Sequence, residues 1–151
     1  MPAVQTSYPN FRGAGFAGMI ANGEWVTNII SRVVDPAAAL AVNFGDPVLQ
    51  GPSEQTVVSA NGNAGVFRGI AIRDTTLPPG NNDQYTATTT IGVMTKGVVW
   101  VNAAVAVNPG QAAYYTGAGA LTNVATGNTA IPNGIWESAA SGAALAKLRL
   151  N

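Results

Sequence analysis

Carboxylates are the first side chains to consider for acid–base or metal chemistry here, because the 151-residue chain contains no His and no Cys. Those absences exclude histidine bases, thiol nucleophiles, and Cys- or His-bound zinc, haem and iron–sulfur sites. Hydrolysis by paired carboxylates needs two of them across a cleft. Asp74 and Asp83 flank the longest predicted loop, but both have the setting of turn and ion-pair residues. The segment 81–83 also lacks the ligand spacing of a calcium loop. We therefore expect neither a carboxylate pair nor a metal site.

The remaining candidates for chemistry are a lysine and three tryptophans. Lys96 could form a Schiff base only with a partner base, and none is evident, so we expect it to point outward from a strand. Trp25, Trp100 and Trp136 could form a sugar-stacking platform, but Trp100 lies between valines and is expected in the core. We therefore predict no catalytic residues, no cofactor and no enzymatic activity.

The charge composition favours a protein that works by associating with other proteins. Seven Lys+Arg balance seven Asp+Glu, and only 9% of residues are charged, against an average near 25%. The chain lacks the basic footprint needed for nucleic-acid binding. Weak electrostatic self-repulsion favours association. This composition is typical of a structural component.

Residues 24–151 show the pattern of a single all-β domain. Val and Thr favour strands, while 18 Gly and 9 Pro mark turns. We expect about ten short strands with turn signals every 8 to 12 residues or so, as in a β-sandwich of jelly-roll type or a small β-barrel. The clearest strands are 25–34, 66–73, 91–93, 98–101, 112–115, 120–124 and 145–150.

Three of these strands carry specific expectations. In 66–73, Val66 and Ile70 should share a face, and Gly69 should mark a bulge or a close backbone approach. Gly97 should separate 91–93 from 98–101, which we expect to be central and buried on both faces. Along the last strand, Leu148 and its alternate neighbours should face inward. Of the pair Tyr114–Tyr115, one ring should face outward as a candidate contact.

The sequence contains one internal echo. Ala41-Val42-Asn43-Phe44-Gly45-Asp46 resembles Ala106-Val107-Asn108-Pro109-Gly110-Gln111, and each precedes a predicted strand. A similar hairpin used twice explains the echo, and a duplicated half-domain is the alternative.

Residues 1–23 form a different kind of segment, an extended N-terminal arm. Its aromatic residues alternate with Gly and Pro without a period of 2 or 3.6, so the segment cannot build its own core, yet aromatic side chains are costly to leave in water. We expect an arm that lies on another surface, either a partner's or that of its own domain. The expected contact residues are Tyr8, Phe11, Arg12 and Phe16, with Trp25 at the root of the arm. Deleting residues 2–23 should weaken binding and leave the β-domain folded.

The N-terminus has no basic start followed by an apolar run, and no stretch is long and apolar enough to span a membrane. We therefore expect synthesis in a cytoplasm and no membrane partner.

Several strings resemble the structural cement proteins of tailed bacteriophages, over roughly residues 40–150. They are Phe67-Arg68-Gly69-Ile70-Ala71-Ile72-Arg73-Asp74-Thr75-Thr76-Leu77-Pro78, Thr95-Lys96-Gly97-Val98-Val99-Trp100-Val101, Gly110-Gln111-Ala112-Ala113-Tyr114-Tyr115, Gly119-Ala120-Leu121-Thr122, Ile131-Pro132 before Trp136-Glu137, and the ending Ala140-Ser141-Gly142-Ala143-Ala144-Leu145-Ala146-Lys147-Leu148-Arg149-Leu150.

The resemblance implies a non-enzymatic virion protein that binds the outer surface of a phage capsid and bridges major capsid subunits. It implies a homodimer or homotrimer as the working form, and it carries over no catalytic residues. The alternative is a carbohydrate-binding β-sandwich of a fibre or secreted protein, which would need exposed coplanar aromatic rings.

Overall fold

The regular structure of the described residues is entirely β. The computed structural model describes residues 15–77 and 83–151, and no α-helix occurs in these two ranges. The strands are β1 (Ile20–Asn22), β2 (Asn28–Val34), β3 (Val42–Asn43), β4 (Pro47–Gln50), β5 (Thr56–Ser59), β6 (Phe67–Ala71), β7 (Gln84–Tyr85), β8 (Thr90–Ala103), β9 (Ala112–Tyr115), β10 (Leu121–Thr122), β11 (Thr129–Trp136) and β12 (Ala144–Leu150). The all-β prediction is confirmed.

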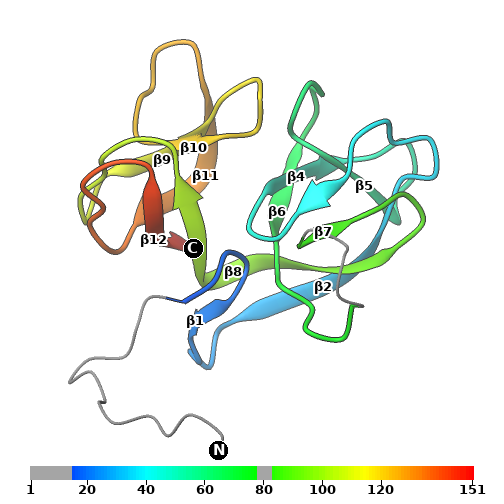
Figure 1. Cartoon of the computed structure of the whole chain (residues 1–151), viewed down its shortest axis with the longest axis horizontal. Helices are drawn as coiled ribbons and strands as arrows, with labels where there is room; N and C mark the ends of the chain where they lie inside the picture. Colours follow the sequence, from blue (N-terminus) through cyan, green and yellow to red (C-terminus); the bar gives the residue numbers. More distant parts are fainter. Residues whose placement is uncertain (1–14, 78–82) are drawn as a thin grey trace, which may run out of the picture.

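The strands close into two five-stranded barrels that share β8. The order β10-β9-β11-β12-β8-β2-β5-β4-β6 is completed by the pairings β10–β8 and β8–β6, so each side of the sheet returns to the same strand. Figure 1 shows the two lobes, with β9 to β12 in yellow to red and β2 to β7 in blue to green. We call them the first barrel (β2, β4, β5, β6 and the start of β8) and the second barrel (the end of β8 and β9 to β12).

A continuous β8 corrects the prediction of two strands separated by Gly97. Gly97 lies inside a strand of 14 residues, at the point where the pairing partner changes from β2 to β12. Its φ of 128° is one that only glycine adopts without strain. Gly97 therefore lets one strand leave the first barrel and enter the second. The residues beyond it, Val98, Val99 and Val101, are fully buried as predicted.

The two barrels have the same topology. In chain order the first uses β2, β4, β5, β6 and the start of β8, and the second uses the end of β8, β9, β10, β11 and β12. In each, the first strand pairs in parallel with the third and antiparallel with the fifth. The second strand pairs antiparallel with the third and the fourth. The fourth and fifth strands are also antiparallel neighbours.

Backbone hydrogen bonds repeat at equivalent places in the two barrels. In the first barrel Gly45 N donates to Ala71 O (2.8 Å), and in the second Gly110 N donates to Trp136 O (2.8 Å). In the same way, Asp35 N to Val57 O (2.9 Å) corresponds to Ala104 N to Leu121 O (2.8 Å). Gly51 N to Thr56 O corresponds to Thr116 N to Ala120 O (both 2.9 Å). The two similar six-residue strings found in the sequence contain Gly45 and Gly110, which occupy equivalent turns in the two barrels with φ of 84° and 87°. The chain is therefore built from two copies of one five-stranded unit.

Two apolar clusters hold the barrels together. The first fills the first barrel and consists of Val34, Val42, Phe44, Val48, Val57, Ala71, Tyr85, Ile91 and Val93. The second fills the second barrel and also takes in Leu49, Ile70 and Met94 of the first. Phe67 stacks on Tyr115 across this contact, with ring centroids 6.1 Å apart. The shared cluster makes the two barrels one packed body.

A bulge in β6 explains where the predicted alternation was wrong. Val48 pairs with Gly69, whereas the next residue, Leu49, pairs with Phe67, so Arg68 is an extra residue in the ladder. The bulge and close approach predicted at Gly69 are both present, but Val66 is 69% exposed whereas Ile70 is buried. An inserted residue reverses the faces of the residues before it.

Two aromatic expectations had different outcomes. Trp100 was expected in the core, but it is only half-buried, with the Lys147 ammonium 5.2 Å from the centre of its ring. Tyr115 is buried while Tyr114 is half-exposed, as the alternation predicted. Leu148 and its alternate neighbours face inward, as expected.

Replacing Gly69 by Ala should destabilise the protein strongly. Its φ is 148°, and an added Cβ would collide with the Met94 carbonyl oxygen and the Val93 side chain. We expect a loss of about 2 kcal/mol or more in the free energy of unfolding, measured by chemical denaturation. Gly117→Ala is the matched control, because nothing lies within 4 Å of its added Cβ, and it should change stability by less than about 0.5 kcal/mol. Equal effects at the two glycines would contradict this account.

Candidate functional site

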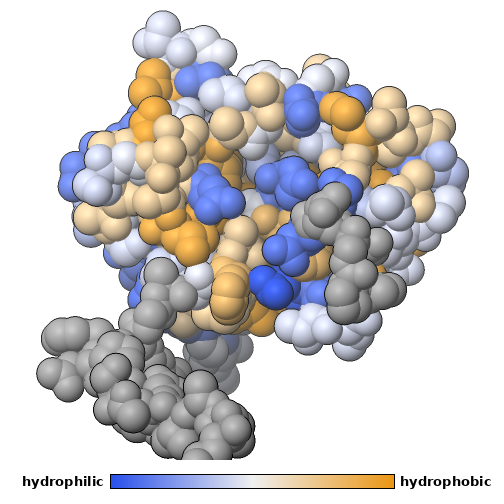
Figure 2. Space-filling view, in the orientation of Figure 1, coloured by the Kyte–Doolittle hydropathy of each residue, from blue (hydrophilic) through white to orange (hydrophobic). Residues whose placement is uncertain are grey.

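Exposed apolar side chains are concentrated in one short part of the chain. Six of the large apolar residues that are exposed lie between residues 16 and 29, and we call this set the N-terminal surface: Phe16, Met19, Ile20, Trp25, Val26 and Ile29. In the described part of the chain four others are exposed, and they lie in separate connections, at Leu40, Val66, Val105 and Val124. Figure 2 shows apolar and hydrophilic side chains interspersed over one face, with apolar atoms at the lower edge where Figure 1 places β1 and β2.

An open groove runs through the N-terminal surface. Phe16, Met19 and Ile20 line it together with Ile72 and Arg73, and its volume is about 480 Å³. The side chains of Ile29 and Ile72 both lie over Gly92. The apolar groups therefore extend from the N-terminal segment onto β2. Contiguous exposed apolar surface of this kind marks a site of association.

Backbone hydrogen bonds fix the N-terminal segment on the β-domain. Trp100 donates its amide to the Met19 carbonyl (2.8 Å) and accepts from Gly18 (2.7 Å), while Arg73 donates to the Gly18 carbonyl (2.7 Å). β1 continues this contact by pairing with β8. Residues 18–22 thus cover one edge of β8, and a deletion of residues 2–23 would strip that edge bare.

Arg73 organises the aromatic side of the groove. Its guanidinium carbon lies 4.7 Å from the centre of the Phe16 ring and 5.8 Å from that of Phe44. Asp83 approaches the same guanidinium at 3.8 Å. A cation over a ring stabilises that ring's position even when the ring is exposed. Phe16 is therefore 62% exposed and yet has a defined partner on one face.

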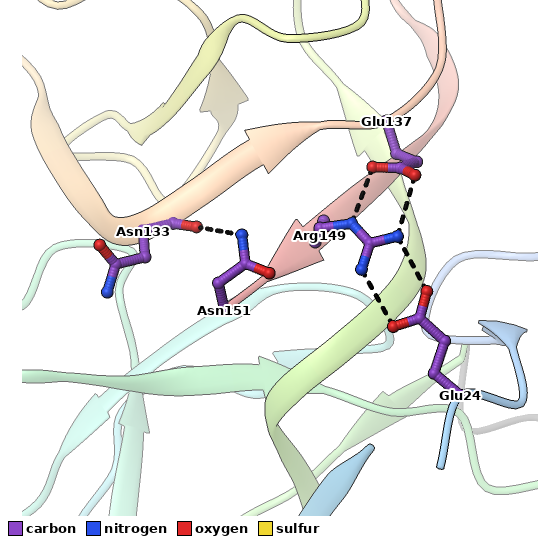
Figure 3. A network of polar contacts seen from close by, with 5 residues as sticks. All are labelled: Glu24, Asn133, Glu137, Arg149 and Asn151. Atoms are coloured by element: carbon purple, nitrogen blue, oxygen red, sulfur yellow. Dashed lines mark hydrogen bonds and ion pairs between the residues drawn. The ribbon is translucent and has the colours of Figure 1, made fainter. Parts of the chain in front are cut away.

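Trp25 projects from the connection between β1 and β2, next to an ion-pair network. The side chain is 98% exposed. The preceding residue, Glu24, receives two hydrogen bonds from Arg149 at 2.9 and 2.8 Å, and Glu137 receives two more at 2.9 and 3.0 Å. Figure 3 shows the guanidinium between the two carboxylates. Thr27 N donates to the Glu24 carbonyl (3.0 Å), so the turn that carries Trp25 is held at its base from β12.

The network also sets the protonation of its carboxyl groups. Hydrogen bonds from Arg149 lower the pKa of Glu24 and of Glu137 below the ordinary value of 4.5. Both carboxylates raise the pKa of Arg149 in turn. A depressed folded-state pKa contributes stability that is present above the unfolded value and is lost as the pH falls through the folded value. The network is therefore intact near pH 7.

Acidification should weaken the native chain more than a variant without the network. Between about pH 5 and pH 2, the wild type should lose the contribution of both carboxylates. The double variant Glu24→Gln/Glu137→Gln has nothing to lose at these positions, so its unfolding midpoint should fall less steeply over the same range. Parallel denaturant titrations at each pH measure the difference. Identical slopes for the two proteins would contradict the assignment of the shifted pKa values to this network.

The predicted contact residues are only partly within the described structure. Tyr8, Phe11 and Arg12 lie outside the described residues. Phe16 and Trp25 both lie on the N-terminal surface. The predicted set did not include the other four members, Met19, Ile20, Val26 and Ile29, because apart from Arg12 only aromatic residues were taken as contacts. The signal that could have found Ile29 was the pair Ile29–Ile30, which places an apolar side chain on each face of a strand.

The carboxylates considered for chemistry have structural partners. Asp74 accepts hydrogen bonds from the amide and hydroxyl of Thr76 (2.8 and 2.6 Å), which lower its pKa, and Asp83 faces Arg73. In the described ranges no three acidic groups gather to hold a metal ion. Lys96 is exposed, as expected.

A sugar-binding platform of three tryptophans is excluded by burial. Trp136 is fully buried and donates to the Thr122 carbonyl at 3.4 Å, so it cannot stack on a ligand beside Trp25. Within residues 15–77 and 83–151 no helix is long and apolar enough to cross a membrane.

Comparison with known proteins places the chain in a virion context. A family model described as structural cement protein (E217 gp24/Pam3 gp6) matches residues 4–151. No curated protein matches the chain. Five chains of solved structures match it. One belongs to "The capsid of Myoviridae Phage XM1", with a TM-score of 0.74, 19% identity, and coverage of 99% of this chain and 98% of that one.

Proposed function

The chain belongs to the phage structural cement protein family, and from this we propose that it binds the outer surface of a phage capsid and bridges neighbouring major capsid subunits. As a cement protein it is a structural component of the virion. The contact with the shell is made by the N-terminal surface together with the rest of the arm, residues 1–23, which includes Tyr8, Phe11 and Arg12. The host cytoplasm is the compartment of synthesis.

One observation carries this proposal: the exposed tryptophan at the tip of a braced turn. Trp25 is 98% exposed, and a large aromatic side chain so placed gains much free energy when a partner covers it. Phe16, Met19 and Ile20, which line the groove, add further exposed apolar groups from the same N-terminal segment. The Arg149 network fixes the turn before binding, which lowers the entropy cost of association.

The low charge of the chain suits attachment to a repeating lattice. Seven positive and seven negative residues give no net charge, so neighbouring copies on one shell would not repel each other strongly. A modest interface per copy suffices where copies act together, because linked contacts gain avidity. We propose that the protein acts as a homodimer or homotrimer whose symmetry matches its place on the lattice.

Trp25→Ala should weaken binding to undecorated, expanded capsids of the cognate phage. Removal of a central aromatic contact typically costs about 2 kcal/mol or more, which is roughly a 30-fold loss of affinity. Co-sedimentation of the protein with capsids at increasing concentration measures this loss. Because Trp25 makes almost no contact within its own chain, the fold and the free energy of unfolding should not change.

Val124→Ala is the matched control, since Val124 is also exposed, at 47%, but lies after β10, away from the N-terminal surface. It should bind within about twofold of the wild type. If Trp25→Ala binds as well as Val124→Ala, the N-terminal surface is not the contact.

A deletion of residues 2–14 should separate the contribution of the first part of the arm from that of the N-terminal surface. It leaves β1 and the Gly18 hydrogen bonds in place, unlike a deletion of residues 2–23. We expect an unchanged thermal midpoint and a loss of affinity for capsids of at least about tenfold, because Tyr8 and Phe11 are removed. Full occupancy of capsids by the truncated protein would show that the arm makes no contact with the shell.

A further inference from the structure

β2 has an open edge in the first barrel. On one side it pairs with β8 from Asn28 to Val33, but on the other side it pairs with β5 only at Val33 and Val34. Val33 N donates to Gln55 O (3.0 Å) and Asp35 N to Val57 O (2.9 Å) on that side. Because backbone groups alternate along a strand, the amides and carbonyls of Ile29 and Ser31 point to the same side of β2 as the amides of Val33 and Asp35. No strand of the described residues pairs with them there.

The matching edge of the second barrel is occupied by the chain itself. The two barrels can be aligned through their parallel pairs, because Val34 pairs with Val57 as Ala103 pairs with Leu121. Counting back from these pairs along each first strand makes Ile29, Ile30 and Ser31 equivalent to Val98, Val99 and Trp100. Each set also pairs with the fifth strand of its own barrel, Ile29 with Met94 and Val98 with Arg149. β1 pairs there with Val98 and Val99. Trp100 exchanges its amide and carbonyl bonds with Met19 and Gly18 at 2.8 and 2.7 Å.

The open edge carries little of the protection found on natural free edges. Such edges are usually blocked by lysines, prolines or bulges, whereas the sequence from Asn28 to Ser31 is uncharged. Ser31 is exposed, and among the described residues its carbonyl accepts a hydrogen bond only from the side chain of the next residue, Arg32 (2.8 Å), which an added strand would share or displace. Ile29 beside it is 38% exposed and belongs to the N-terminal surface.

We propose that the Ile29–Ser31 edge of β2 accepts an extended segment of the major capsid protein as an added antiparallel strand. The incoming strand takes the place that β1 takes in the second barrel, donating to the Ser31 carbonyl and accepting from the Ser31 amide. The shell is the occupant we favour, because Ile29 of this edge belongs to the N-terminal surface that is proposed to contact it; a second copy, which would offer the same β2 edge, is an outcome of the test below. The proposal rests on the proposed function, and it names the backbone groups that contact the shell.

Hydrogen–deuterium exchange, resolved to single amides, tests the added strand. The Ile29 and Ser31 amides should exchange quickly in the free protein and at least about tenfold more slowly on capsids. The Trp100 amide is the internal control, because its bond to Met19 should protect it in both states. Capsid binding without protection at residues 29 and 31 would overturn the added strand and leave the proposed function standing.

Two further outcomes decide against the proposal in different ways. Protection in the free protein that grows with its concentration would assign the edge to a second copy. Failure of the wild type to co-sediment with capsids would overturn both the proposed function and the added strand.

Substitution at Ser31 gives an independent test. Ser31→Pro removes the outward amide without removing an internal hydrogen bond, and proline is tolerated at such edge positions. It should weaken capsid binding by about tenfold, which corresponds to about 1.4 kcal/mol. Ser31→Ala keeps the amide and should bind within about twofold of the wild type. Equal binding by the two variants would overturn the proposal, and the exchange experiment decides the matter if Ser31→Pro does not fold.

Discussion

The structure depends on one constraint: a single strand must serve two barrels at once. β8 supplies the last strand of the first barrel and the first strand of the second, and the change of partner falls at Gly97. The glycine's φ of 128° and the burial of Val98 and Val99 leave few alternatives for the path of the chain. Since the apolar cluster of the second barrel includes Ile70 and Met94 of the first, neither barrel keeps its packing without the other. A rigid two-barrel body suits a protein that holds other subunits in place, because a flexible link would let them move.

The N-terminal segment completes this body and also carries its most exposed apolar groups. Residues 18–22 cover one edge of β8, and the turn that follows presents Trp25 while Arg149 holds Glu24. The same few residues therefore serve both the fold and the proposed association with the shell. The repeated topology adds a second consequence, because the edge that β1 covers in one barrel is open in the other. Because β1 already pairs with this edge in the second barrel, a strand from a partner could pair with the equivalent edge of the first barrel with little rearrangement.

Sequence patterns predicted the local elements better than their assembly. The last strand, the bulge at Gly69 and the buried run after Gly97 follow from alternation and glycine placement. The continuous β8 was missed, because a glycine inside a strand and a glycine between two strands have the same local signal. The position of Val66 was missed for a related reason, since one inserted residue reverses the faces on either side of it.

The repeat was visible in the sequence only as two six-residue strings. Their equivalence becomes clear when Gly45 and Gly110 donate to Ala71 and Trp136, each of which lies 26 residues further along the chain. Such long-range pairings leave no local trace in composition or periodicity. The candidate site was partly predictable for the opposite reason: Phe16 is an aromatic residue outside any periodic element, Trp25 stands at the first position of the predicted strand 25–34, ahead of the observed β2, and both are exposed.

Cryo-electron microscopy of expanded capsids, with and without the purified protein, would show whether and through which residues the protein binds the shell. We expect regular added density on the outer surface, bridging adjacent major capsid subunits, with the Trp25 turn and the open edge of β2 against the shell. Added density in which those residues face solvent would contradict the proposed contact. Bare capsids at saturating protein would contradict the proposed function itself.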